Sequence, residues 1–215
     1  MLKMDELRKT DNYESWMEGF QTSLNKYNEE QIITTEYNIK LVLNNDKTLS
    51  NKIVYNMFAD RTEKTESMPW DIFCADDAII HGNQFWTDDD FSGLLVYFGE
   101  KYGLRNKDMI RNVFQIYRKE HRYHPIRNYL RNLKWDGKNR IETVFIDFFG
   151  ADDNAYIREI SRLFFTAAVK RIFEPGCKFD NILVLISAEK GASQGIGKTT
   201  FWEKLLLIMN GLTLR

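Results

Sequence analysis

The sequence predicts a mixed α+β protein, with a predominantly helical N-terminal region followed by the start of an α/β domain. Three observations support this fold class. Apolar residues recur every three or four positions through much of residues 88–173, which is typical of helices packed on one face. The apolar run NILVLIS at 181–187 is typical of a strand buried on both faces. A glycine-rich stretch, GASQGIGKTT at 191–200, follows that run.

The composition is that of a folded protein. Of the 215 residues, 43% are hydrophobic and 28% are charged, and only 3 are Pro. Cys74 and Cys177 lie far apart and in no metal-binding spacing, which favours a reducing compartment. The first residues contain no apolar run, and no stretch approaches the roughly 18 apolar residues of a membrane span. We therefore expect a cytoplasmic protein without a membrane partner.

We divide the chain into three regions. They are 1–36, a polar helical lead-in; 37–123, a mixed helical accessory domain; and 124–215, the N-terminal part of a phosphate-loop domain. In the first region, Trp16, Phe20 and Leu24 stand at helical spacing and predict a peripheral helix, the alternative being a partly ordered lead-in. In the second region, residues 35–46 predict a short helix, and the alternation over 51–61 predicts a strand.

Start signals mark the next helices. The acidic run Asp88–Asp90 suits the first turn of a helix better than it suits a cation site. Asn106 can cap a second helix, and residues 124–135 predict a third. His121 and His124 have no Cys or carboxylate partners at metal-binding spacing, so we interpret them as surface or cap residues.

Two further helices are predicted before the apolar run. Asn139 and Glu142 have the spacing of a capping box, and Gly150 closes the helix that they open. Asp152 or Asp153 opens the longest helix. Its inward-facing residues are predicted to be Tyr156, Ile160, Leu163, Phe164, Ala167 and Ala168.

The glycine-rich stretch has the three parts of a phosphate-binding loop. A buried strand at 181–187 aims the chain, glycines expose backbone N–H groups, and a helix over 199–209 points its positive end at the anion. Residues 192–199 fit the spacing G-x-x-x-x-G-K-[ST] if Ala192 replaces the first Gly. The predicted nucleotide-binding residues are Gln194, Gly195, Ile196, Gly197, Lys198, Thr199 and Thr200. The alternative is a glycine-rich turn with an exposed lysine.

Two of these residues have specific roles in such a loop. Lys198 would reach the β- and γ-phosphates, and the Thr199 hydroxyl would bind Mg²⁺.

Charge is distributed unevenly. Residues 1–100 carry 9 Lys and Arg against 19 Asp and Glu, whereas residues 101–140 carry 12 against 3. A basic segment with interleaved aromatic residues favours single-stranded nucleic acid as a partner, because phosphates and bases can both be bound. The predicted contacts are Arg122, Arg127, Arg131, Lys134, Lys138 and Arg140. The alternative is that this segment folds against the acidic half.

Several motifs together resemble the virulence-associated protein E family, which phages, plasmids and genomic islands encode. They are YHPIRNYLRNLKWDGKNRIETVF at 123–145, RIFEPGCKFDNILVLIS at 171–187 and QGIGKTTF at 194–201. The resemblance spans roughly residues 37–205. It implies an ATPase domain related to those of replicative primase-helicases, of the AAA+ and superfamily-3-helicase type. It also implies ATP and Mg²⁺ as cofactors, a role in DNA replication in a bacterial host cell, and a homo-oligomer.

The resemblance further implies groups that this sequence does not supply. Such ATPases need a later acidic residue that orients Mg²⁺ and water, a polar sensor, and an arginine from a neighbouring subunit. None can be placed between Thr200 and Arg215, where Glu203 lies within the loop's own helix. We therefore expect the N-terminal part of a longer ATP-binding replication protein with no identifiable catalytic residue, either truncated in the gene or completed by a C-terminal segment on another chain.

Two other functions stay open. The first alternative is a non-catalytic module that binds DNA or protein and has a vestigial loop. A small P-loop kinase is weaker, because its long helical upstream region would be unexpected.

Overall fold

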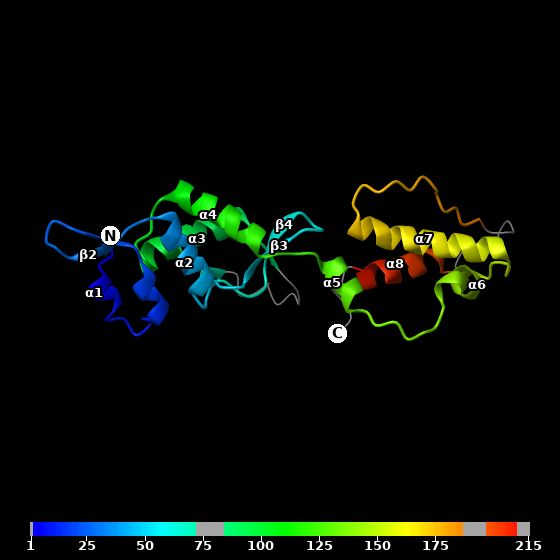
Figure 1. The fold of residues 1–215 in the computed structure, drawn as a ribbon, viewed down its shortest axis with the longest axis horizontal. Coiled ribbons are helices and arrows are strands. Elements are labelled where there is room, and N and C mark those ends of the chain that lie inside the picture. Colours follow the sequence, from blue (N-terminus) through cyan, green and yellow to red (C-terminus); the bar gives the residue numbers. More distant parts are fainter. Residues whose placement is uncertain (1, 72–83, 187–196, 210–215) are drawn as a thin grey trace. The chain divides into compact units, whose positions relative to one another are not determined.

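Helices carry most of the regular structure, and the strands form two small sheets, which confirms the mixed α+β class (Figure 1). The computed structural model describes residues 2–71, 84–186 and 197–209. Contacts divide the chain into unit 1, Met1–Tyr123, and unit 2, His124–Arg215, and each is described by itself. In these described ranges, every helix is too short or too polar to cross a membrane.

Unit 1 begins with short elements. They are α1 (Met4–Leu7), the 3₁₀ helix η1 (Ser15–Gly19) and an antiparallel hairpin of β1 (Thr22–Leu24) with β2 (Glu30–Ile32). The Asn25 side chain accepts hydrogen bonds from the backbone N–H groups of Tyr27 and Glu29, and Asn28 adopts a left-handed φ of 57°. The helix predicted through Trp16, Phe20 and Leu24 is therefore wrong, since this turn folds the chain back as a hairpin.

The first residues belong to the core of unit 1. Met4, Leu7, Met17, Phe20 and Ile32 are all buried in one cluster with side chains from later elements. Their spacing follows no single helical face because three different elements supply them.

The helix α2 (Glu36–Asn45) is confirmed, and the Thr35 side chain caps it by accepting from the Asn38 N–H. The strand predicted over 51–61 is shorter than expected. It ends with β3 (Ile53–Asn56), because the Asn56 side chain accepts from the N–H groups of the turn that follows.

A four-stranded sheet has the order β5-β4-β3-β6. β4 (Arg61–Lys64) lies antiparallel to β3 and to β5 (Gln84–Phe85), and β6 (Arg122–Tyr123) lies parallel to β3. Two predicted helices, α3 (Asp88–Lys101) and α4 (Lys107–Glu120), are confirmed. Thr87 and Asp90 form a capping box at α3, and Asn106 caps α4, as its sequence predicted.

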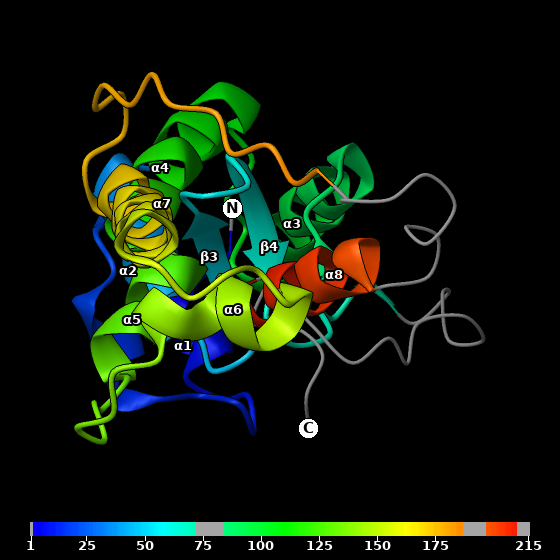
Figure 2. The ribbon, with the colours of Figure 1, turned by 90° about the vertical axis from the view of Figure 1, so that its right-hand side faces the viewer.

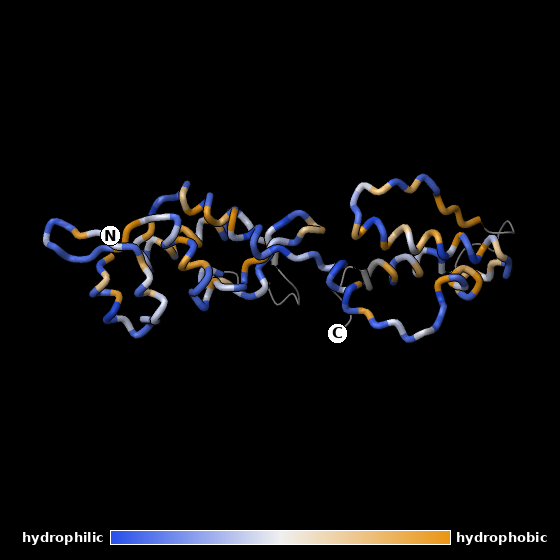
Figure 3. Tube along the Cα trace, in the orientation of Figure 1, coloured by the Kyte–Doolittle hydropathy of each residue, from blue (hydrophilic) through white to orange (hydrophobic). Residues whose placement is uncertain are grey.

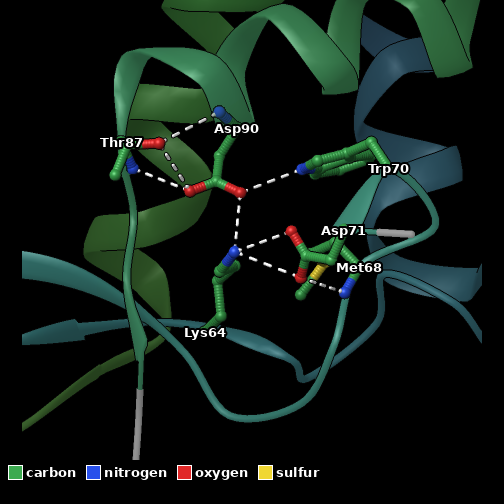
Figure 4. Close-up of polar contacts among 6 residues, drawn as sticks. All are labelled: Lys64, Met68, Trp70, Asp71, Thr87 and Asp90. Atoms are coloured by element: carbon green, nitrogen blue, oxygen red, sulfur yellow. Dashed lines mark hydrogen bonds and ion pairs between the residues drawn. The ribbon is translucent and has the colours of Figure 1, made fainter. Parts of the chain in front are cut away.

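A buried ion cluster joins the sheet to α3 (Figure 4). The Lys64 ammonium lies 2.7 Å from an Asp90 carboxylate oxygen and 2.9 Å from one of Asp71. The Trp70 indole N–H donates to the same Asp90 oxygen. Burial alone would raise the pKa of Asp90, but hydrogen bonds from Lys64 and Trp70 outweigh it and hold that pKa below its usual value.

Asp46 forms a second buried polar centre in unit 1. Its carboxylate accepts hydrogen bonds from the hydroxyls of Tyr97, Tyr102 and Thr48, and it lies 3.1 Å from the Lys101 ammonium. Burial raises the pKa of Asp46, but these donors outweigh it and lower the pKa to about 2. The carboxylate therefore fixes the end of α2 against α3.

Unit 2 is helical in its described part. It contains α5 (Pro125–Asn132), the 3₁₀ helix η3 (Ile141–Thr143), α6 (Val144–Phe149), α7 (Ala155–Phe173) and α8 (Lys198–Met209). His124 caps α5, as predicted, and Gly150 closes α6 with a left-handed φ of 66°.

Three details of unit 2 differ from the prediction. Asn139 caps no helix, because a 3₁₀ turn at 141–143 precedes α6. Asn154 caps α7 in place of Asp152 or Asp153. Tyr156 on α7 is 71% exposed, whereas Ser161 is buried and donates to the Ile141 carbonyl. The inward face of α7 is therefore set by its packing on η3, which the apolar periodicity does not reveal.

Candidate functional site

The start of α8 carries the predicted phosphate-binding lysine. Gly197 has a left-handed φ of 78°, and its carbonyl accepts from the Phe201 N–H at 2.9 Å in the first helical turn. Glycine suits this backbone, because a residue with a Cβ is strained there. Lys198 is half-buried, and Thr199 and Thr200 are exposed. The first N–H groups of a helix lack intrahelical partners and point toward any anion in front of them.

Aromatic side chains hold α8 against α6 and α7. The ring of Phe201 lies 4.9 Å from Phe149 and 5.5 Å from Phe148, and Trp202 lies 5.6 Å from Phe164. Figure 2, which looks along α7, shows α6 and α8 side by side. Edge-to-face and tilted ring pairs of this kind stabilise packing beyond simple burial. The start of α8 is therefore anchored on two helices.

A cleft of about 980 Å³ lies within unit 2. One wall comes from α6, α7 and the turn between them, and the other comes from residues 179–186, which run back beside α7 (Figure 1). Lys198 contributes to the lining. The polar lining residues besides Lys198 are Asp152, Asn154 and Asn181. Apolar walls with a few convergent polar groups are typical of small-molecule sites.

The strand predicted at 181–187 is not present in its described part. Residues 181–186 form no strand, and no backbone hydrogen bond joins them to another described segment. Figure 3 shows this run as hydrophobic, yet Ile182 and Ile186 are each 87% exposed. A strand needs a neighbour to satisfy its N–H and C=O groups, and the described part of unit 2 offers none. Exposure nevertheless alternates, because Leu183 and Leu185 are half-buried.

The predicted nucleotide-binding residues divide into two groups. Gln194, Gly195 and Ile196 lie outside the described residues, as do Gly191 and Ala192. The others are the four consecutive residues Gly197, Lys198, Thr199 and Thr200 at the start of α8. The helix predicted over 199–209 is confirmed and starts one residue earlier.

Magnesium would have one protein ligand here. Among the described residues, His, Cys, Asp and Glu form no group of three that could hold a metal ion. The Thr199 hydroxyl is exposed at the end of α8 that faces the loop. Mg²⁺ fits such a site when phosphate oxygens and waters fill its other positions.

The six predicted nucleic-acid contacts occupy different environments. Arg122 lies in unit 1, on β6, and the others lie in unit 2. Arg127 donates to the carbonyls of Ile172 and Phe173 and thereby caps the C-terminus of α7. Lys134 and Lys138 are exposed.

The two remaining arginines are held by internal contacts. The Arg131 guanidinium lies 5.6 Å from the ring centre of Phe173. Arg140 forms two hydrogen bonds with Asp136 and lowers the pKa of that carboxyl to about 2. The structure therefore brings Arg127 and Arg131 together at the end of α7, where they serve the fold.

Sequence reasoning missed the residues that shape the cleft. Asp152 was predicted only as a helix-start residue, and Asn154 was not predicted to have a role. Both residues line the cleft together with Lys198. These two residues are more than 40 positions from Lys198 in the sequence. No local pattern predicts that they lie in the same cleft. The basic segment 101–140 includes α4, but Lys107, Arg111 and Arg118 were not among the predicted contacts, although their spacings of four and seven place them on one helical line.

The comparisons with known proteins concern unit 2. No curated protein matches the chain. Residues 130–209 match the model of the Virulence-associated protein E-like domain, and these residues include α6, α7, α8 and Lys198. The C-terminal part of this chain is therefore similar to the virulence-associated protein E family, as its motifs suggested, and the match points to a protein of a phage or mobile element.

Proposed function

We propose that this chain binds ATP with Mg²⁺ at the start of α8, as part of a primase-helicase-like replication protein of a phage or mobile element. The observation that carries the proposal is the position of Lys198. It follows a left-handed Gly197, begins an anchored helix and lines a cleft large enough for a nucleotide. A helix N-terminus combined with a lysine suits a triphosphate in both charge and hydrogen bonding.

The chemistry of binding follows from three kinds of group. Backbone N–H groups at the start of α8 donate to phosphate oxygens. The Lys198 ammonium adds a charge-assisted hydrogen bond, and the Thr199 hydroxyl is a ligand for Mg²⁺. The metal, when bound, neutralises charge between the β- and γ-phosphates.

Hydrolysis is a separate property. Glu203 is the one carboxylate of α8, and it lies on the exposed side of the helix that Lys198 begins. We propose that the groups that activate water lie outside α8, and that an arginine among them comes from a neighbouring subunit of a homo-oligomer. Hydrolysis of ATP at an ordinary enzymatic rate by the monomeric protein would contradict this part of the proposal.

The test is calorimetric titration of the 215-residue chain with ATP, in the presence and absence of Mg²⁺. Loss of one charge-assisted hydrogen bond is worth roughly 1.5–3 kcal/mol, so Lys198→Ala should weaken binding by about 10- to 100-fold. Lys204→Ala is the matched control, because it removes the same charge from an exposed position on the same helix. Equal affinities of the wild type and Lys198→Ala would reject the site.

A second candidate function is a non-catalytic module that binds DNA or protein and has a vestigial loop. The observation that favours it is the exposed run at 182–186, because a phosphate loop normally follows a paired strand. Absence of ATP binding at millimolar concentration, together with intact folding, would support this second function.

A further inference from the structure

Three basic residues of α4 follow one line on unit 1, and a fourth, on β6, is the sheet partner of Tyr55. We call Lys107, Arg111 and Arg118 of α4, with Arg122 of β6, the α4 basic stripe. With 100° per residue, positions 107, 111 and 118 fall within about 40° on the helix, and they extend over roughly 16 Å. Neither Lys107, Arg111 nor Arg118 was among the predicted nucleic-acid contacts.

Aromatic rings hold the two central guanidinium groups in place. Arg111 lies 5.2 Å from the ring centre of Phe91 on α3, and Arg118 lies 5.2 Å from that of Tyr55 on β3. Arg118 also donates to the Thr62 hydroxyl at 3.1 Å. A stacked guanidinium is already ordered, so it loses less conformational entropy when it binds a phosphate.

In the described part of unit 1, no ion pair neutralises the charge of the stripe. Among the ion pairs of the described residues, none involves Lys107, Arg111, Arg118 or Arg122. The carboxylates of α4 are Asp108 and Glu120, which lie off this line, and Glu120 pairs with Lys40. Two carboxylates lie near its ends: Asp60 accepts a hydrogen bond from the hydroxyl of Tyr55, the ring beside Arg118, and Glu100 lines a shallow pocket together with Lys107.

The position of the stripe on α4 favours a single strand of nucleic acid over a duplex. Its residues border the buried face of α4, where Ile110, Phe114 and Tyr117 pack, and they lie in the corner with α3 and β3. The outermost face of α4 is different, because Asp108, Gln115 and Lys119 leave it without net charge. A helix that enters a duplex groove reads it with its outermost face. A flexible single strand can follow the junction of α4 with α3 and β3.

We propose that the α4 basic stripe binds the backbone of single-stranded nucleic acid. The three or four phosphates that these residues can neutralise give a slope of log affinity against log salt of about −2 to −3. The proposal is independent of the nucleotide site, so Lys198→Ala should leave this binding unchanged.

The test is fluorescence anisotropy of labelled oligothymidylate with the 215-residue chain across a salt series. The variant Lys107→Gln with Arg111→Gln and Arg122→Gln should reduce the slope by about 2 and weaken binding about 10-fold or more at low salt. Lys119→Gln is the control, because it is exposed on α4 but lies about 100° from Arg118. Circular dichroism confirms that each variant is folded.

Four outcomes would overturn the proposal, three of which concern the variants and the nucleic acid. These three are an unchanged slope in the triple variant, an equal loss with Lys119→Gln, and tighter binding of duplex DNA than of the single strand. Competition by polyglutamate as effective as that by oligothymidylate would also overturn it and assign the stripe to an acidic protein. The variant Arg118→Lys, which keeps the charge but loses the flat stack on Tyr55, should bind more weakly than the wild type with an unchanged slope.

Discussion

The two units differ in how they treat apolar side chains. Unit 1 buries a continuous core in which Phe98 and Tyr102 are fully covered. In the described part of unit 2, Ile126 and Phe145 are the buried hydrophobic residues, whereas Ile182, Val184 and Ile186 face solvent. A contiguous exposed apolar run is typical of a surface that binds something else. The described part of unit 1 therefore buries its apolar side chains in its own core, whereas unit 2 has exposed apolar side chains and a cleft.

The units also differ in how they treat basic side chains. In unit 2, Arg140, Arg158 and Arg162 pair with nearby carboxylates, and Arg127 caps a helix. In unit 1, Arg111 and Arg118 of the α4 basic stripe lie over aromatic rings, and among the described residues no carboxylate forms an ion pair with them. Local basic composition therefore does not locate a polyanion site, because the pairing of each charge decides whether it is available.

The largest expected effect compares a buried with an exposed apolar side chain. Phe98→Ala should lower the free energy of unfolding of unit 1 by roughly 3–5 kcal/mol, since it empties a filled core. Ile182→Ala should change stability by under about 0.5 kcal/mol, since that side chain is already in water. Chemical denaturation followed by circular dichroism measures both. A large loss with Ile182→Ala would show that residues 181–186 are packed in solution.

The next effect concerns acid stability of unit 1. The Asp46 pKa of about 2 lies below the ordinary 3.8, so the ionised form stabilises the fold. This contribution, about 2 kcal/mol, is fully present above pH 4 and is lost as the pH falls from 4 toward 2. Asp46→Asn should flatten the dependence of the unfolding free energy on pH in that window. An unchanged pH dependence would mean that Asp46 is not the titrating group.

The smallest effect compares two glycines of unit 2. Gly137 and Gly197 have left-handed φ values of 82° and 78°, and a Cβ would meet nothing within 4 Å at either. Alanine at each should therefore cost a similar strain of about 1–2 kcal/mol. Gly197→Ala should also weaken ATP binding, whereas Gly137→Ala should not. Equal ATP affinities of the Gly197→Ala and Gly137→Ala variants would show that Gly197 is not part of the nucleotide site.

The sequence predicted the elements whose signals are local. The helices α3 and α4 have caps and apolar periodicity within their own residues, and both appear as expected. The helix α8 and the Gly197–Lys198 junction also follow from a short motif. These features need no knowledge of distant partners.

Features that depend on distant partners were not predictable in the same way. The N-terminal hairpin forms through turn contacts around Asn25, and its core residues come from three elements. The apolar composition of residues 181–186 predicts a buried strand. Burial also requires neighbouring strands, and the local sequence carries no information about them.

Hydrogen–deuterium exchange of the 215-residue chain with and without Mg·ATP tests the central claim most directly. The account predicts that the first turn of α8, from Lys198 to Phe201, becomes protected, while α4 in unit 1 exchanges as before. Unchanged exchange in that turn at saturating Mg·ATP would contradict a nucleotide site at the start of α8.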